Sequence, residues 1–140
     1  MGIIGGGTIA HLILEHVARG ELGDARVCAI LGRSNVSRAR ALAQAHSVAF
    51  FTGLDELIAS CPDVVVEAAS HDAVRSYAEP LLSSGIALVV LSGGALCDDA
   101  LRETLEAAAR RTGVLLYVPS GGIGGLDALK AACFAGVEEV

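Results

Sequence analysis

The sequence predicts an α/β protein built on a doubly wound parallel sheet. Short apolar, often β-branched runs alternate with helical patterns through six rounds along the 140 residues. Glycines gather where strands are followed by helices. Hydrophobic residues make up 53% of the chain and charged residues 19%, which is the composition of a packed globular protein rather than a disordered one. The length fits about one domain.

The first half of the chain carries three strand–helix units. Its apolar runs predict strands at residues 3–4, 25–31 and 48–51. The helical patterns that follow them cover residues 8–19, 36–45 and 54–60. In the first helix the apolar stripe is Ile9, Leu12, Ile13 and Val17, and His11 and His16 fall outside it. Thr52 and Asp55 have the spacing of a capping box for the third helix.

The second half repeats the alternation. Strands are predicted at residues 63–68, 86–91 and 114–118. Ser70 should cap the helix after the first of these, and Gly85 should end it. Asp98 and Asp99 open a further helix and complement its dipole. After a second glycine-rich turn at residues 119–125, residues 127–134 have a helical pattern.

The glycine turn after the first strand predicts a dinucleotide site. Gly5-x-Gly7-x-x-Ala10 fits the fingerprint G-x-G-x-x-G/A of Rossmann-type folds. Gly5 permits the tight turn, Gly7 lets a pyrophosphate approach the backbone, and Ala10 lets the helix lie close to its strand. The alternative is an ordinary turn without a ligand. It is less well supported, because the turn lies between a predicted strand and a predicted helix.

The end of the second strand bears on cofactor choice. NAD-selective sites usually carry an acidic residue there, which holds the ribose 2′-hydroxyl. Here Gly32 is followed by Arg33 and Ser34, and a cation with a hydroxyl suits a 2′-phosphate. The sequence therefore predicts acceptance of NADP(H), with NAD(H) as the other option. The alternative is that Arg33 is a solvated surface charge.

Three later loops should lie at the same edge of the sheet. The small residues in the loop 68–71 leave room for the nicotinamide half of a dinucleotide. The backbone of residues 92–95 could line the nicotinamide ribose. His71 is either a proton-transfer candidate or a first-turn helix residue. Glu67 either takes part in the chemistry of the site or only forms local hydrogen bonds. Residues 120–125 are either a point of close ligand approach or a hinge between domains, and the two interpretations are compatible.

Composition excludes several other classes. The net charge of −6 and the absence of a basic run argue against a nucleic-acid partner. No apolar stretch approaches the roughly 18 residues of a membrane span, and no signal peptide is expected. No nucleophile triad, metal cluster or catalytic carboxylate pair is visible. The scattered cysteines predict reduced thiols in the cytoplasm: Cys28, Cys61, Cys97 and Cys133.

Three segments resemble the L-aspartate dehydrogenase family. They read VVVEAASH at 64–71, LSGGAL at 91–96 and PSGGIGGLDAL at 119–129. The resemblance covers nearly the whole chain, and the last segment is the most specific. It implies NAD(P)-dependent oxidative deamination of L-aspartate to iminoaspartate, which hydrolyses to oxaloacetate or enters NAD biosynthesis. The implied cofactor-binding positions are Gly5, Gly6, Gly7, Thr8, Ile9, Ala69, Ser70, Ser92, Gly93 and Gly122. The family more often has alanine at Gly122, and often valine or another small residue at Gly93.

One departure limits what carries over. Family members are about twice as long, and their catalytic histidine lies in a second domain. No histidine of this chain matches it, so no catalytic residue is assigned. Residues 1–119 are expected to form the dinucleotide-binding domain, and residues 120–140 a hinge and the beginning of a catalytic and dimerisation domain. We expect a homodimer, and the 140 residues alone to be inactive. The alternatives are a non-catalytic nucleotide-binding module and an oxidoreductase resembling homoserine dehydrogenase or dihydrodipicolinate reductase.

Overall fold

A parallel sheet lies at the centre of the molecule. The computed structural model describes residues 1–35, 37–121 and 133. Its six strands run in the order β3-β2-β1-β4-β5-β6, and every neighbouring pair is parallel. The strands are β1 (Gly2–Ile4), β2 (Ala29–Leu31), β3 (Ala49–Phe51), β4 (Val64–Glu67), β5 (Ala87–Val90) and β6 (Leu116–Tyr117). The chain winds outward from β1 in one direction and then, from β4, in the other, which confirms the predicted doubly wound fold.

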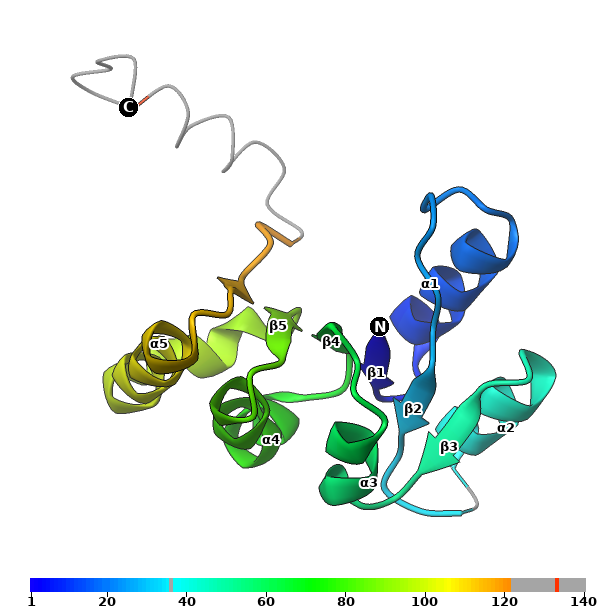
Figure 1. Cartoon of the computed structure of the whole chain (residues 1–140), viewed down its shortest axis with the longest axis horizontal. Helices are drawn as coiled ribbons and strands as arrows, with labels where there is room; N and C mark the ends of the chain where they lie inside the picture. The colour runs from blue at the N-terminus through cyan, green and yellow to red at the C-terminus, as the bar shows by residue number, and fades with distance from the viewer. Residues whose placement is uncertain (36, 122–132, 134–140) are drawn as a thin grey trace.

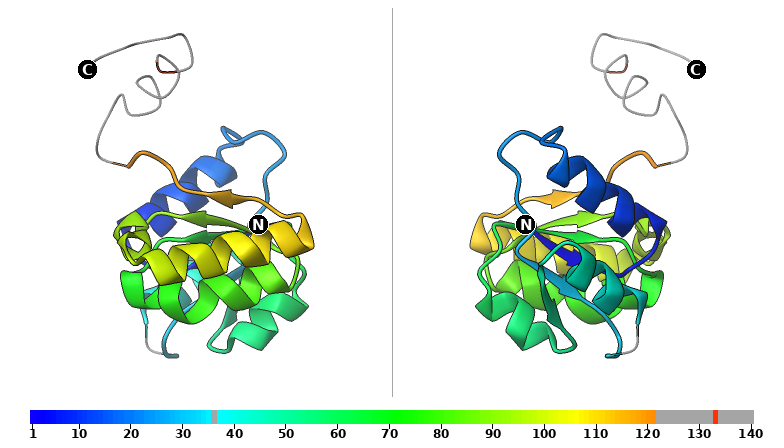
Figure 2. Two further views of the ribbon diagram at one scale, coloured as in Figure 1. Left: turned by 90° about the vertical axis from the view of Figure 1, so that its left-hand side faces the viewer. Right: turned by 90° about the vertical axis from the view of Figure 1, so that its right-hand side faces the viewer.

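Helices cover both faces of this sheet. They are α1 (Thr8–Ala18), α2 (Arg38–Ala45), α3 (Leu54–Ala59), α4 (His71–Ser83), α5 (Asp99–Thr112) and the short 3₁₀ helix η1 (Gly93–Cys97). Figures 1 and 2 show α4 and α5 side by side below the sheet, with α1 on the opposite face. The larger core cluster lies on the α3–α5 face and includes Leu81, Leu88 and Leu105, which are fully buried. The smaller cluster joins Ile3 and Ile30 to α1 and α2.

Several predicted boundaries need correction. The second strand is only Ala29–Leu31, because its partner β1 comprises only Gly2–Ile4 and the pairing cannot extend further. The other predicted strands and helices are shortened by one or two residues at one or both ends, except that β1 begins one residue earlier than predicted. The capping box at Thr52 is wrong by one residue. Gly53 is the N-cap of α3, and its backbone N–H donates to the Glu56 carboxylate at 3.2 Å.

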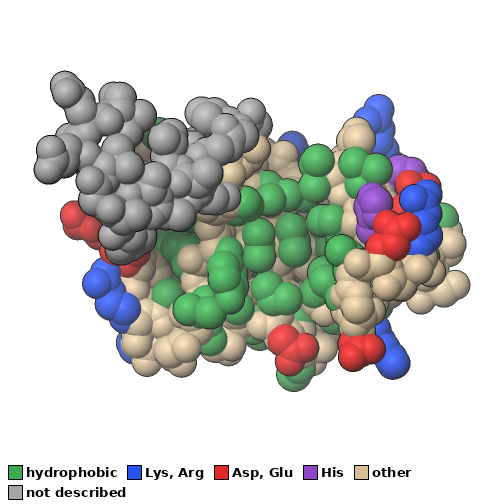
Figure 3. All heavy atoms as spheres, turned by 90° about the horizontal axis from the view of Figure 1, so that it is seen from above, with side chains coloured by type: hydrophobic (Ala, Val, Ile, Leu, Met, Phe, Trp, Pro, Cys, Tyr) green, Lys and Arg blue, Asp and Glu red, His purple; other side chains and the backbone are tan. Residues whose placement is uncertain are grey.

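The apolar stripe predicted for α1 is also partly wrong. Ala10 and Leu14 are the buried residues of this helix, whereas Ile9 and Leu12 are 48% and 41% exposed. Other exposed large apolar residues include Leu115 and Tyr117 in the β5–β6 region. Figure 3 shows hydrophobic side chains gathered across the face of the molecule that is seen from above. Within the described residues, no helix covers the β4–β6 half of this face, so these side chains lack the packing that the periodicity anticipated.

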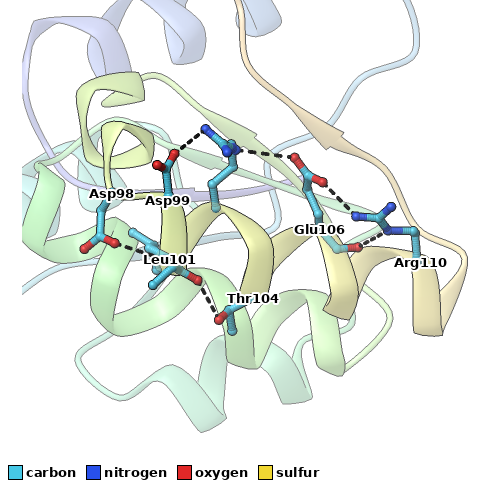
Figure 4. Close-up of polar contacts among 8 residues, drawn as sticks. Asp98, Asp99, Leu101, Thr104, Glu106 and Arg110 are labelled. Atoms are coloured by element: carbon cyan, nitrogen blue, oxygen red, sulfur yellow. Dashed lines mark hydrogen bonds and ion pairs between the residues drawn. The ribbon is translucent and has the colours of Figure 1, made fainter.

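Helix α5 is stabilised at its start and along its outer side (Figure 4). Asp98 is the N-cap, and its carboxylate accepts a hydrogen bond from the backbone N–H of Leu101 at 3.2 Å. This places a negative charge at the start of the helix, as expected from the sequence. Arg102 pairs with Asp99 at 2.8 Å, and Arg110 pairs with Glu106 at 2.7 Å. These exposed pairs contribute little each, so the helix is held mainly by its buried leucine and alanine face.

Helix α5 ends at Gly113, whose φ of +75° lies in the left-handed region. We expect Gly113→Ala to lower the free energy of unfolding by about 1 kcal/mol, because a Cβ disfavours this backbone conformation. An added Cβ would meet nothing within 4 Å, so no steric clash contributes. Urea unfolding measures the loss. The control Gly113→Asn should lose less, since asparagine tolerates this region; equal stability of Gly113→Ala and the unmodified chain would contradict the prediction.

Candidate functional site

A pocket opens where the first, second and fourth strands end. Its volume is about 530 Å³, within the usual range for small-molecule and cofactor sites. The carboxyl ends of β1, β2 and β4 meet here, and the strand order reverses between β1 and β4. The lining residues come from the strand ends, the loops after them, the start of α2 and the first two turns of α4: Ile4, Gly5, Gly6, Gly7, Leu31, Gly32, Arg33, Ser37, Arg38, Ala39, Ala68, Ala69, Ser70, Asp72, Ala73, Ser76 and Tyr77.

Gly5 makes the turn at the floor of this pocket. Its φ is +109°, and its backbone N–H donates to the Leu31 carbonyl at 2.9 Å. A Cβ at this position would lie 2.5 Å from the carbonyl oxygen of Ala68. Both the conformation and the close approach therefore require glycine.

Gly7 has a different reason to be glycine. It is the N-cap of α1, with extended φ and ψ that any residue can adopt, and a Cβ there would meet no protein atom within 4 Å. The first turn of α1 contains no acidic residue and receives no side-chain cap. Its unpaired backbone N–H groups and the helix dipole therefore present a positive end that suits an anion.

Gly6, expected to contact the cofactor, also serves the packing of α2. A Cβ at Gly6 would lie 2.3 Å from the backbone nitrogen of Ala39. A Cβ at Gly32 would lie 2.8 Å from the Ala39 side chain. The two glycines let the start of α2 pack closely against the glycine turn, which the fingerprint alone did not indicate.

Two arginines lie on the β2 side of the pocket. Arg33, predicted from the sequence, and Arg38, which it did not indicate, both line it and are exposed. Within the described residues, neither guanidinium has an ion-pair or hydrogen-bond partner, whereas Arg40 donates to Asn35 at 2.9 Å. Arg38 occupies the first position of α2, where a cation opposes the helix dipole. That unfavourable position is the signal that could have found it. Ser34 is exposed beside Arg33 but does not line the pocket.

Ser37 supplies a polar group without a partner. Its hydroxyl is buried, lines the pocket and makes no hydrogen bond, although the residue is the N-cap of α2. Leaving a buried hydroxyl unsatisfied costs about 1–3 kcal/mol. A ligand oxygen in the pocket would satisfy it, which is one direct indication that the cavity accepts a polar molecule.

We expect Ser37→Ala to have opposite effects on stability and on binding. Without ligand the variant should be as stable as the unmodified chain or up to about 1 kcal/mol more stable, because an unpaired buried hydroxyl is removed. Its affinity for NADPH should fall about threefold to tenfold through the lost hydrogen bond. Thermal unfolding with and without NADPH measures both. A variant that loses stability without ligand would show that the hydroxyl has a partner in the folded chain.

The loops after β4 and β5 meet at Glu67. Ala69 and Ser70 line the pocket, and their backbone N–H groups donate to the Glu67 carboxylate at 2.8 and 2.9 Å. The backbone N–H and the hydroxyl of Ser92 donate to the same carboxylate, each at 3.0 Å. Glu67 thus forms the local hydrogen bonds of one of the two interpretations, and in addition it binds Ser92, which the sequence did not indicate. Ser92 and Gly93 do not line the pocket but are connected to its wall through this carboxylate.

The remaining candidate residues that the structure describes do not line the pocket. Thr8 and Ile9 are exposed at the start of α1. Gly122 lies outside the described residues. His71 is exposed in the first turn of α4, and a Cβ at Gly94 would lie 2.8 Å from its Nε2 atom, so the histidine ring packs over this glycine. It does not line the pocket, which favours the first-turn interpretation.

Helix α4 contributes a wall that the sequence did not indicate as part of the site. Its members are Asp72, Ala73, Ser76 and Tyr77. Their spacing places them on one side of a helix that begins beside the pocket. Among the described residues, no group of three or more His, Cys, Asp or Glu side chains could hold a metal ion. No described helix has the length and hydropathy to cross a membrane. All four cysteines are free.

A protein-family model matches most of the chain. The model of the NAD-binding domain of homoserine dehydrogenase matches residues 5–119. Among curated proteins, the L-aspartate dehydrogenase of Methanocaldococcus jannaschii is 37% identical over 140 residues, which cover 100% of this chain and 52% of the relative. L-aspartate dehydrogenase 2 of Bordetella pertussis is 42% identical over 132 residues, 94% of this chain and 48% of the relative. The chain spans about half the length of the relatives it matches.

Solved structures give the same picture of the fold. The aspartate dehydrogenase of Thermotoga maritima has a TM-score of 0.64 and 26% identity, with 93% of this chain and 49% of that chain covered. The biliverdin reductase of Synechocystis, solved with biliverdin and NADP⁺, has a TM-score of 0.71 and 29% identity, with 84% and 36% covered.

Proposed function

The chain belongs to the family defined by the NAD-binding domain of homoserine dehydrogenase, and from that premise we propose that it forms the nucleotide-binding half of an NAD(P)-dependent L-aspartate dehydrogenase. The observation that carries the proposal is the similarity to enzymes of that name along the whole chain. The resemblance of residues 64–71, 91–96 and 119–129 to the family supports it.

The chain's own residues fit the cofactor at three points. Gly7 leaves open space at the positive end of α1 for the pyrophosphate. The Arg33 and Arg38 guanidinium groups and the unpaired Ser37 hydroxyl offer donors to a ribose 2′-phosphate. The proposal therefore favours NADP(H) over NAD(H). We retain Gly122, Thr8 and Ile9 as proposed contacts from the family resemblance.

The proposed reaction is the oxidation of L-aspartate to iminoaspartate, which feeds NAD biosynthesis. When bound, the cofactor supplies a nicotinamide ring that takes up a hydride. The pocket residues bind and orient it, and the groups that hold the substrate and take its proton lie beyond residue 119. Residues 1–119 then form the nucleotide-binding domain, and residues 120–140 the connection to a catalytic and dimerisation domain. The family match, which ends at residue 119, supports this boundary.

A chimera tests the activity. Residues 1–119 of this chain would be joined to the C-terminal half of the Methanocaldococcus jannaschii relative, and NADPH formation would be followed with L-aspartate and NADP⁺. We expect turnover by the chimera, and NADPH binding without turnover by the 140 residues. A chimera that binds NADPH but leaves L-aspartate unchanged would show that this chain does not serve as the nucleotide-binding half of an aspartate dehydrogenase. Absence of NADPH binding by the chain itself would overturn the nucleotide site.

A second candidate follows from the description of the matching family. Because that model is named for homoserine dehydrogenase, oxidation of homoserine is the competing activity. A matched chimera would join residues 1–119 to the C-terminal half of a homoserine dehydrogenase and be assayed with homoserine. We expect the chimera with the aspartate dehydrogenase half to turn over faster than the matched one. The reverse result would favour the second candidate.

Assembly and location complete the proposal. The exposed apolar residues, Ile9, Leu12, Leu115 and Tyr117 among them, support association of this half of the protein with a second copy as well. The four free cysteines support a reducing, cytoplasmic environment. Light scattering of the purified chain tests the first point, and a monomer at micromolar concentration would contradict it.

A further inference from the structure

Glu67 is a buried carboxylate without a cation. It is the last residue of β4 and is 1% exposed. Among the described residues, Glu67 is the one charged residue whose side chain is buried. It takes part in no ion pair with them. Burying a carboxylate is unfavourable unless hydrogen bonds replace its water. The donors around it therefore show what the residue does.

All of those donors come from the two loops beside the pocket. One carboxylate oxygen, Oε1, accepts the backbone N–H groups of Ala69 and Ser70 and the hydroxyl of Ser92. The other, Oε2, accepts the backbone N–H of Ser92. A carboxylate has acceptor sites for all four bonds, and an ionised carboxylate has nothing to donate. Glu67 thus clamps the loop after β4 to the loop after β5.

The clamped loops stand next to the glycine turn. The carbonyl of Ala68 contacts Gly5 so closely that a Cβ there would lie 2.5 Å away, and Ala69 and Ser70 line the pocket. The strand order β2-β1-β4-β5 gives a direction across the site. With the pyrophosphate at Gly7 and the 2′-phosphate on the β2 side, the other half of the dinucleotide extends toward β4 and β5.

We propose that Glu67 is a positioning residue for the nicotinamide half of the cofactor. It holds the loops after β4 and β5 in one arrangement before the cofactor binds. Binding then does not include the entropic cost of ordering these loops. This inference rests on the proposed nucleotide site. Four donors and near-complete burial leave Glu67 no access to a reacting atom, so it acts through Ala69, Ser70 and Ser92.

Glu67→Gln isolates this role. Glutamine keeps the shape and one acceptor oxygen, but its amide N–H₂ then faces the backbone N–H of Ser92, so one hydrogen bond becomes a contact between two donors. Calorimetry would compare the affinities for NADPH and for 2′,5′-ADP, which carries only the adenosine half. We expect about a tenfold loss for NADPH and less than about a twofold change for 2′,5′-ADP.

Hydrogen exchange gives a readout that needs no ligand. Without cofactor, the backbone N–H of Ser92 should exchange faster in Glu67→Gln, while the helix interior of α5 keeps its protection. Equal losses of affinity for the two ligands, or unchanged exchange at Ser92, would overturn the proposal. Failure of the unmodified chain to bind either ligand would instead overturn the nucleotide site.

Ser92→Ala provides the milder variant. It removes one of the four donors and leaves the three backbone N–H groups in place, so folding should be unaffected. We expect about a threefold loss for NADPH with 2′,5′-ADP binding unchanged. If Glu67→Gln does not fold, hydrogen exchange of Ser92→Ala without cofactor decides the question: faster exchange of the Ala69 and Ser70 N–H groups would support the clamp, and unchanged exchange would overturn it. Equal weakening of both ligands would show that Glu67 serves the fold alone.

Discussion

Gly7→Ala is expected to reduce the affinity for NADPH at least about 30-fold while lowering the free energy of unfolding by no more than about 1 kcal/mol. Gly7 has an extended backbone that alanine can adopt, and its Cβ would meet no protein atom. The small loss of stability comes from the poorer N-cap. The loss of affinity follows because the new methyl group occupies the space where a pyrophosphate approaches the start of α1. Calorimetry with NADPH and urea unfolding measure the two effects.

Gly6→Ala is the matched control, because the same methyl group is added one residue earlier. Its Cβ would lie 2.3 Å from the Ala39 backbone, so α2 has to move. We expect a loss of about 1–3 kcal/mol in the free energy of unfolding. If Gly7→Ala instead destabilised the chain as much as Gly6→Ala does, and binding fell only in proportion, the open space at Gly7 would have no part in binding.

Replacing Arg33 and Arg38 together by alanine is expected to lower the affinity for NADPH about 30- to 100-fold and the affinity for NADH by less than about threefold. Both guanidinium groups line the pocket and have no partner among the described residues. The charge-assisted hydrogen bonds that they would give a 2′-phosphate are absent with NADH. Because both side chains are exposed, added salt should narrow the difference between the two cofactors in the unmodified chain.

Arg40→Ala is the control for net charge. Arg40 lies on α2, as Arg38 does, but it donates a hydrogen bond to Asn35 and does not line the pocket. Its removal should leave the ratio of NADPH to NADH affinity unchanged. Equal losses for the two cofactors in the Arg33 and Arg38 double variant would mean that the arginines do not read the 2′-phosphate.

Much of this architecture could be predicted from local patterns. Apolar runs of the right length give the strands, and Gly5 with Gly7 marks the first strand-to-helix turn. Ser70 caps α4 as expected, with its hydroxyl accepting the Ala73 N–H at 3.2 Å. These features depend on neighbours in the sequence, so the sequence displays them directly.

The features that escaped prediction depend on residues brought together by the sheet. Gly6 is constrained by Ala39, and Glu67 by Ser92, in each case across a crossover connection. The exposure of Ile9 and Leu12 depends on which helices cover the β4–β6 half of the face. Periodicity identifies an apolar stripe on a helix but gives no information about the surface opposite it.

The parallel pairing of β1 with β4 has a consequence for how the protein folds. β1 lies between β2 and β4, and Gly2 pairs with Val65 across the middle of the sheet. The glycine turn is closed on one side by Leu31 and on the other by Ala68. Neither the centre of the sheet nor the nucleotide pocket can form until β4 has joined, and such non-local pairing is slow because a long loop must close first. During synthesis the three strand–helix units that precede β4 therefore cannot complete the sheet until residue 68 has left the ribosome.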